Sequence, residues 1–240
     1  MVIGLLTAAG RGTRMGHDVP KQFLCVRGKP IIVHTMERFQ RHPEVDGLVV
    51  VTLPDRIDFV WDCAETFGIT KLRQVVVGGE TGLESIGNGL DALAAECPPD
   101  TTVMIHDGNR PLVSDEIISD SLSTFRKRGS AVAVIPCVEV VFKSDNDREA
   151  NEEIPREWLW RTQTPHTYAL GKLLWALKQA RARGLSGMAA MCQLMSRLGE
   201  TTYCSKGSEK NLKLTTPDDM DIFKALLFAE DTERRNMPCG

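Results

Sequence analysis

The stretch that decides the fold is residues 8–16, Ala-Ala-Gly-Arg-Gly-Thr-Arg-Met-Gly, followed closely by Pro20-Lys21-Gln22-Phe23. It comes directly after an apolar run at residues 2–7, which is typical of a short buried strand. Glycines after a first strand let backbone N–H groups approach a phosphate closely. Arg14 and Lys21 add positive charge where phosphoryl transfer needs it. The stretch therefore predicts a strand that opens into a phosphate-binding loop.

Two familiar phosphate motifs do not fit this loop. The dinucleotide fingerprint G-x-G-x-x-G would need a glycine where Met15 stands, which argues against a nicotinamide dehydrogenase. The Walker motif would need Gly-Lys-Ser/Thr at its end, and this is absent from the loop. The remaining alternative to a phosphate site is a glycine-rich turn with an Arg and a Lys on the surface.

Downstream, apolar runs alternate with helical patterns, which predicts an α/β fold with a mostly parallel sheet and helices on both faces. Further strands are expected at residues 47–52, 74–77, 102–106, 131–136 and 201–204. Helices are expected at residues 30–41, 55–67, 84–96, 114–128, 171–183, 188–198 and 218–228. The pattern contains no repeat and no low-complexity linker, so we expect one domain over residues 1–230 and a flexible tail at 231–240.

Residues 140–160 interrupt the alternation. Both ends of this segment are strand-like and apolar, and its middle, residues 144–153, is polar. This pattern is typical of a hairpin that projects from the body. Because an exposed apolar base usually packs on something, we expect this arm to contact a second copy of the chain in a homodimer.

Composition narrows the class of partner and compartment. The formal net charge is −3, so a basic surface for nucleic acid is not expected. No apolar run approaches the ~18 residues of a membrane span. The seven cysteines form no C-x-x-C pair, which predicts neither a zinc site nor a disulfide framework. A reducing cytoplasm suits them best.

Beyond the first loop, several further blocks carry a family resemblance. They lie at residues 78–80, Ser85, 106–111, 162–166 and 211–219. Together with the loop and the Pro-Lys-Gln-Phe run, they resemble the family of 2-C-methyl-D-erythritol 4-phosphate cytidylyltransferases and their relatives, the ribitol 5-phosphate cytidylyltransferases. The resemblance spans almost the whole chain and implies a single Rossmann-like nucleotidyltransferase domain that uses CTP and a polyol phosphate.

The resemblance also implies roles for individual residues. Residues implied to contact the nucleotide are Ala8, Ala9, Gly10, Gly79, Glu80 and Ser85. Residues implied to stabilise the transferred phosphate are Arg14, Lys21 and Lys213. Arg110, Arg156 and Thr164 are implied to hold the polyol phosphate, with Arg156 coming from the arm of a partner subunit. Asp107 is implied to bind Mg²⁺.

The residues themselves support part of this assignment. Asp107 follows an expected strand, where open α/β sheets place ligands, and a carboxylate there suits a hard cation shared with phosphates. The alternative for Asp107 is a turn cap, since Asp is common after strands. The alternative for Lys213 is an ordinary solvated lysine. His106 is expected to be a core histidine because its strand is buried.

Three positions depart from the family pattern. Gly82 stands where an Arg is common, Glu139-Val140 where Asp-Thr is common, and Gly187-Met188 where Thr-Asp is common. These departures leave the polyol open. 2-C-Methyl-D-erythritol 4-phosphate ranks first and ribitol 5-phosphate or another polyol phosphate is the alternative. A catalytically silent nucleotide-binding relative is a second alternative.

Overall fold

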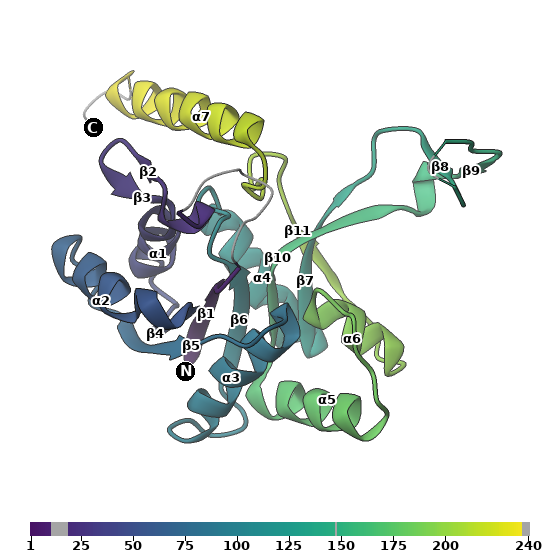
Figure 1. The fold of residues 1–240 in the computed structure, drawn as a ribbon, viewed down its shortest axis with the longest axis horizontal. Helices are drawn as coiled ribbons and strands as arrows, with labels where there is room; N and C mark the ends of the chain where they lie inside the picture. Colours follow the sequence, from purple (N-terminus) through teal and green to yellow (C-terminus); the bar gives the residue numbers. More distant parts are fainter. Residues whose placement is uncertain (11–18, 147, 237–240) are drawn as a thin grey trace.

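The computed structural model describes residues 1–10, 19–146 and 148–236, and its centre is a seven-stranded sheet (Figure 1). The strand order is β11-β7-β10-β6-β1-β4-β5. The strands are β1 (Val2–Ala8), β4 (Gly47–Thr52), β5 (Leu72–Val77), β6 (Thr102–Asp107), β7 (Ser130–Pro136), β10 (Trp160–Ala169) and β11 (Cys204–Lys206). A small hairpin of β2 (Cys25–Val26) and β3 (Lys29–Pro30) lies beside the sheet.

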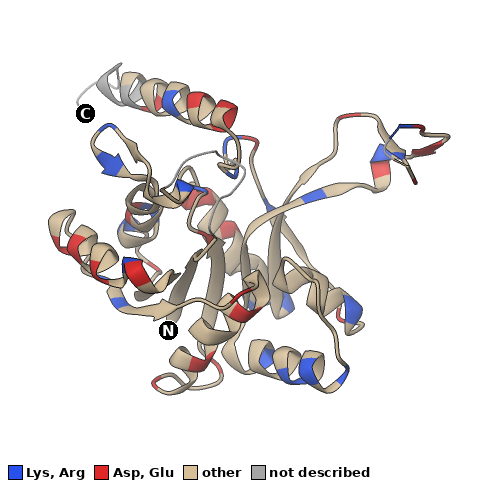
Figure 2. Ribbon diagram, in the orientation of Figure 1, with Lys and Arg blue, Asp and Glu red and all other residues tan. Residues whose placement is uncertain are grey.

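The sheet is mostly parallel, as the sequence predicts. β1 pairs in parallel with β4 and with β6, and Thr7 of β1 lies opposite Asp107 of β6. The carboxyl ends of these strands therefore meet at one edge, and the loops that follow them share a side of the molecule. The strands β1, β4 and β6 are almost free of charged residues, which gather on the helices and in the arm (Figure 2).

β10 is the antiparallel strand of the sheet, between β6 and β7. The sequence analysis did not predict this strand beyond the arm's return at Trp160. Its sequence is rich in Thr, Gln and His, without the apolar run of a buried strand. Several of its polar side chains are buried and form hydrogen bonds, as Thr167 does with the hydroxyl of Ser121 at 2.7 Å.

Helices cover both faces of the sheet, which confirms the predicted layering. One face packs against α1 (Ile31–Arg41), α2 (Ile57–Thr66) and α4 (Asp115–Arg128). The other packs against α3 (Gly82–Ala94), α5 (Leu170–Ala182) and α6 (Met191–Arg197). In α1, Ile32, Met36 and Phe39 recur at helical spacing and are fully buried, so burial of one apolar stripe anchors the helix.

Helix caps decide where two of these helices begin. Ser114 caps α4 by accepting the N–H of Ile117, as expected. α3 begins at Gly82, two residues before the expected start, because Thr81 and Glu84 cap each other reciprocally. In contrast, no side chain caps α2, and a 3-10 turn at Pro54–Arg56 precedes it instead.

The hairpin arm is present and projects from the body (Figure 1). It contains β8 (Val141–Lys143) and β9 (Glu152–Ile154), followed by a 3-10 turn at Arg156–Trp158. Large apolar side chains of the arm are exposed, with Trp158 at 78% exposure. They are Val138, Val140, Phe142, Trp158 and Trp160.

The C-terminal segment differs from expectation in two places. The late strand lies at Cys204–Lys206, after the expected residues 201–204. The last helix, α7 (Pro217–Asn236), runs beyond the expected end at residue 228, so residues 231–236 of the expected tail are helical. Phe223 of α7 packs with Ile31 and Leu112, which holds this helix near the start of α1. Among the described helices, none is both long and apolar enough to cross a membrane.

Candidate active site

A cavity of about 260 Å³ lies at the carboxyl ends of β1 and β6. It brings together residues from seven separate parts of the chain, as expected for a site at this edge of an α/β sheet. The residues implied by the resemblance that line it are Ala8, Ala9, Gly10, Lys21, Gly79, Glu80, Ser85, Asp107, Thr164 and Lys213. Arg14 lies outside the described residues.

Gln22 holds the end of the first loop in place. Its side-chain N–H groups donate to the carbonyl oxygens of Ala8, at 2.6 Å, and Gly10, at 2.9 Å. Gln22 is buried, and it follows Lys21 in the 3-10 turn Lys21–Phe23. This bracing fixes the turn beside the loop, so Lys21 lines the cavity. The sequence pattern assigns Gln22 no role of its own, although Gln22 stands within the Pro-Lys-Gln-Phe run.

One side of the cavity is a glycine wall, residues 78–85, at the start of α3. A Cβ on Gly78 would overlap the Cβ of Ala9, and one on Gly79 would overlap that of Glu84. The backbone at Gly78 and Gly79 therefore packs so closely against its neighbours that a side chain at either position would clash. The hydroxyl of Ser85 accepts the N–H of Gly79 at 3.1 Å, which closes the wall against the helix.

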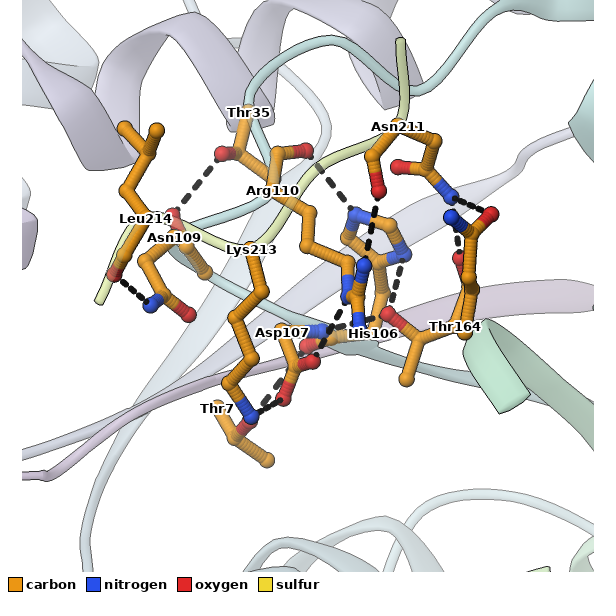
Figure 3. Close-up of polar contacts among 12 residues, drawn as sticks. Thr7, Thr35, His106, Asp107, Asn109, Arg110, Thr164, Asn211, Lys213 and Leu214 are labelled. Carbon is orange, nitrogen blue, oxygen red and sulfur yellow. Dashed lines mark hydrogen bonds and ion pairs between the residues drawn. The ribbon is translucent and has the colours of Figure 1, made fainter. Parts of the chain in front are cut away.

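The other side is a charged floor, formed by Asp107, Arg110 and Lys213 (Figure 3). The two carboxylate oxygens of Asp107 accept from Arg110 Nε at 2.9 Å and from Lys213 Nζ at 3.0 Å. Burial acts to raise the pKa of Asp107, but the two cations outweigh burial and hold the pKa well below its usual range. Asp107 is therefore a carboxylate throughout the neutral range.

These contacts bear on the alternatives left open by the sequence. In the described contacts, the Asp107 carboxylate faces side-chain cations rather than the backbone N–H groups that a turn cap would hold. The side chain of Lys213 is 44% exposed, yet its amine is bonded to Asp107 and it lines the cavity. Lys213 therefore differs from an ordinary solvated lysine.

Two implied substrate residues do not line the cavity of their own chain. Arg110 is buried, and its Nη1 donates to the carbonyl of Asn211 at 2.7 Å while its Nε holds Asp107. Its guanidinium thus braces the charged floor from behind. Arg156 is exposed on the arm and donates to the carbonyl of Val138 at 3.0 Å.

Thr164 and His166 also line the cavity, and His106 contacts Thr164 from the buried core. The Oγ1 of Thr164 accepts the backbone N–H of Asp107 at 3.0 Å and lies 2.9 Å from Nδ1 of His106. His106 is fully buried, as expected for a core histidine. His166, which the sequence analysis did not select, lines the cavity. Burial lowers the pKa of each imidazole to about 4, so both rings are neutral near pH 7.

The site can accommodate one Mg²⁺ ion beside bound phosphates. Among the described residues no group of three His, Cys, Asp or Glu side chains could form a complete metal site. Mg²⁺ needs no such cage when one carboxylate and substrate phosphates hold it. Asp107 supplies that carboxylate, and each of its oxygens keeps acceptor capacity beyond its present hydrogen bond.

The departures from the family pattern lie in three different settings. Gly82 lines the cavity, and a Cβ there would lie 3.5 Å from the carbonyl oxygen of Ala189, an ordinary contact. Met188 is buried in the core beside α5 and α6. Val140 is 62% exposed on the arm. Of the three, Gly82 is the one that borders this chain's own cavity.

Comparison with known proteins agrees with this geometry. The family model for 2-C-methyl-D-erythritol 4-phosphate cytidylyltransferase matches residues 2–229. A ribitol-5-phosphate cytidylyltransferase of Lacticaseibacillus paracasei is 39% identical over 229 residues, covering 95% of this chain and 98% of that protein. A 2-C-methyl-D-erythritol 4-phosphate cytidylyltransferase of Geotalea uraniireducens is 36% identical over 234 residues, covering 97% and 99%.

The fold also matches a solved structure. The crystal structure of 4-diphosphocytidyl-2C-methyl-D-erythritol synthase from Anaerococcus prevotii superposes with a TM-score of 0.80 at 24% identity, covering 94% of this chain and 95% of that chain. The family match over nearly the whole chain and the cavity at the strand ends lead to one conclusion. The chain belongs to the 2-C-methyl-D-erythritol 4-phosphate cytidylyltransferase family and is a cytidylyltransferase.

Proposed function

We propose that the cavity transfers CMP from CTP to a polyol phosphate. An oxygen of the polyol phosphate attacks the α-phosphorus of CTP, a new P–O bond forms, and the bond to the leaving pyrophosphate breaks. The attacking oxygen is already anionic, so no protein nucleophile is needed. The observation that carries the proposal is the charged floor facing the glycine wall across one cavity.

Catalysis then consists of positioning and charge stabilisation. Lys21 and Lys213 both line the cavity and supply positive charge to the reacting phosphates; Arg14 belongs to the same proposed set. Mg²⁺ held by Asp107 would neutralise charge on the phosphate oxygens when bound. Arg110 and Lys213 keep Asp107 ionised and aimed, so the carboxylate is ready without a proton transfer.

The nucleotide is proposed to lie along the glycine wall and the first loop. Gly79 and Glu80 are proposed to meet the cytosine, with Ser85 holding Gly79 in place, while Ala8, Ala9 and Gly10 line its path to the phosphates. The wall suits a flat base because its glycines let the backbone itself form the surface. Backbone N–H and C=O groups can then recognise the edge of the base.

Of the two polyols, we propose ribitol 5-phosphate in preference to 2-C-methyl-D-erythritol 4-phosphate, reversing the ranking from sequence alone. Both fit the family, and the relative from Lacticaseibacillus, named for ribitol-5-phosphate, is the more similar of the two compared. Gly82 and Val140 also remove a guanidinium and a hydroxyl common in the methylerythritol phosphate pattern. Both differences favour a polyol phosphate other than 2-C-methyl-D-erythritol 4-phosphate.

A panel of polyol phosphates with CTP and Mg²⁺, scored by pyrophosphate release, tests this proposal. We expect ribitol 5-phosphate to give the highest kcat/KM. A higher value for 2-C-methyl-D-erythritol 4-phosphate would restore the first ranking. No release with any polyol phosphate would favour the catalytically silent alternative.

The arm is proposed to complete the site of a second subunit. Its exposed apolar side chains suit burial in a homodimer, and Arg156, in the 3-10 turn of the arm, does not line the cavity of its own chain. Mixing an Arg156→Ala protein with a Lys21→Ala protein should restore part of the activity, because one mixed site has both residues. A fully active monomer by light scattering would contradict this arrangement.

The six described cysteines are all free, which supports a cytoplasmic location.

A further inference from the structure

The backbone N–H of Asp107 has an unusual partner. Asp107 ends β6, and the pairing of β10 with β6 covers His166 to Ala169. The ladder between β10 and β6 stops at His166 opposite Ile105, so no backbone pair of β10 reaches Asp107. The side chain of Thr164 takes over, and its Oγ1 accepts the Asp107 N–H at 3.0 Å.

His106 determines what the Thr164 hydroxyl can do. The Nε2 of His106 lies 3.1 Å from the carbonyl oxygen of Arg110, which can only accept, so Nε2 carries the ring proton. The ring is fully buried, and in the described contacts its nitrogens meet the Arg110 carbonyl and the Thr164 hydroxyl rather than a carboxylate, so a second ring proton would be a buried charge without a paired anion. Nδ1 is therefore unprotonated, and it accepts the hydroxyl proton of Thr164 at 2.9 Å.

The Thr164 hydroxyl is consequently unable to donate into the cavity. Its one proton is donated to Nδ1 of His106, and its oxygen already accepts the Asp107 N–H. A phosphate monoester above pH 7 is a dianion, because its second pKa is about 6, and it offers acceptors only. Two acceptors do not form a hydrogen bond, so the phosphate needs other donors, such as Lys213.

We propose that His106 is a positioning residue, which orients the Thr164 hydroxyl to hold the backbone of Asp107 rather than the phosphate of the polyol. This proposal rests on the proposed function, and it changes the role that the family resemblance implies for Thr164. The Asp107 carboxylate is then held from three sides: through its own backbone by Thr164, and through its oxygens by Arg110 and Lys213.

Steady-state kinetics at pH 8 test the proposal, using the polyol phosphate that wild type accepts. We expect Thr164→Val and His106→Gln each to lower kcat by roughly 10- to 100-fold, the usual scale for residues that orient a metal ligand. The KM for the polyol phosphate should change by less than about 3-fold. The double variant should be no worse than the poorer single variant, because both break one chain of contacts. Thr164→Ser keeps the hydroxyl and should stay near wild type.

A matched control separates positioning from general loss of structure. His42 is also buried, and its Nε2 lies 2.9 Å from the hydroxyl of Ser119, away from the cavity. His42→Gln should therefore leave kcat unchanged. If Thr164→Val instead raises the KM of the polyol phosphate more than about 10-fold while His106→Gln does nothing, Thr164 holds the phosphate and the proposal is wrong.

The ring tautomer provides a test that does not depend on turnover. ¹⁵N NMR of the His106 imidazole should show a protonated Nε2 and an unprotonated Nδ1 between pH ~6 and ~8. A protonated Nδ1 would overturn the proposal even if the enzyme is active. Failure of wild type to use any polyol phosphate would instead refute the proposed function, while the tautomer result would still stand.

Discussion

The glycine wall and the charged floor face the same cavity but are built by different physical means. The wall is backbone packed so closely that Gly78 and Gly79 leave no room for a Cβ. The floor is a network of ions, in which one carboxylate is held by two cations. The wall thus fixes a shape, and the floor fixes a charge. Variants of the wall should therefore affect nucleotide binding, and variants of the floor should affect stability and turnover.

The largest effect is expected at the centre of the floor, from Asp107→Asn. The change leaves the buried guanidinium of Arg110 without its carboxylate, and breaking such a pair costs about 3 kcal/mol of unfolding free energy. Denaturant unfolding at pH 7 measures this difference. Asp221→Asn, in an exposed pair with Lys224, is the control and should stay within about 0.5 kcal/mol.

The pH dependence of this difference has a definite sign. The pKa of Asp107 in the folded protein is below its unfolded value of about 3.9. Its contribution is therefore complete well above pH ~4 and is lost as the pH falls from there towards the folded pKa. The difference in unfolding free energy between wild type and Asp107→Asn should therefore become smaller in acid. A gap that stays constant from pH ~6 to ~3 would show that the carboxylate charge is not what stabilises the floor.

The next effect is expected from Lys213→Ala, through turnover. Removing one preorganised donor to a developing charge typically lowers kcat about 100-fold or more. The KM for CTP should change little, because Lys213 lies on the floor rather than on the wall. Lys210→Ala is the control, since Lys210 is exposed on the same segment and does not line the cavity. Equal effects of the two substitutions would remove Lys213 from the catalytic set.

The glycine wall gives a matched pair of substitutions with a smaller effect. Gly78→Ala introduces a Cβ that overlaps Ala9, and such overpacking costs about 1–3 kcal/mol. Displacement of the wall should raise the KM for CTP about 10-fold, with a smaller change in kcat. Gly82→Ala adds the same methyl group in ordinary contact and should have little effect. Similar kinetics for both variants would show that close packing of the wall does not govern nucleotide binding.

The sequence predicted the parts of this molecule that depend on local patterns. The strand expected at residues 2–7, the buried stripe of α1 and the Ser114 cap each carry their signal in a short stretch. β10 did not, because its buried polar residues are satisfied by partners distant in sequence, such as Ser121 for Thr167. The same reason hid the roles of Gln22 and Asn211, whose partners are backbone carbonyls elsewhere in the chain. Many residues that line the cavity were named from the family resemblance, whereas His166 and the residues that brace the site required the fold.

The smallest expected effect concerns Ser85, where the wall meets α3. Its hydroxyl accepts the N–H of Gly79 at 3.1 Å and donates to the Gly79 carbonyl at 3.4 Å, so Ser85→Ala removes both neutral contacts, of which the shorter is worth about 1 kcal/mol. The KM for CTP should rise about 5-fold, less than for Gly78→Ala, since 1.4 kcal/mol corresponds to ~10-fold. Because the hydroxyl is engaged with the wall, we expect the preference for CTP over UTP, measured as a ratio of kcat/KM values, to stay unchanged. A fall in that ratio would mean that Ser85 reads the base directly, and the wall would then contribute chemical recognition as well as shape.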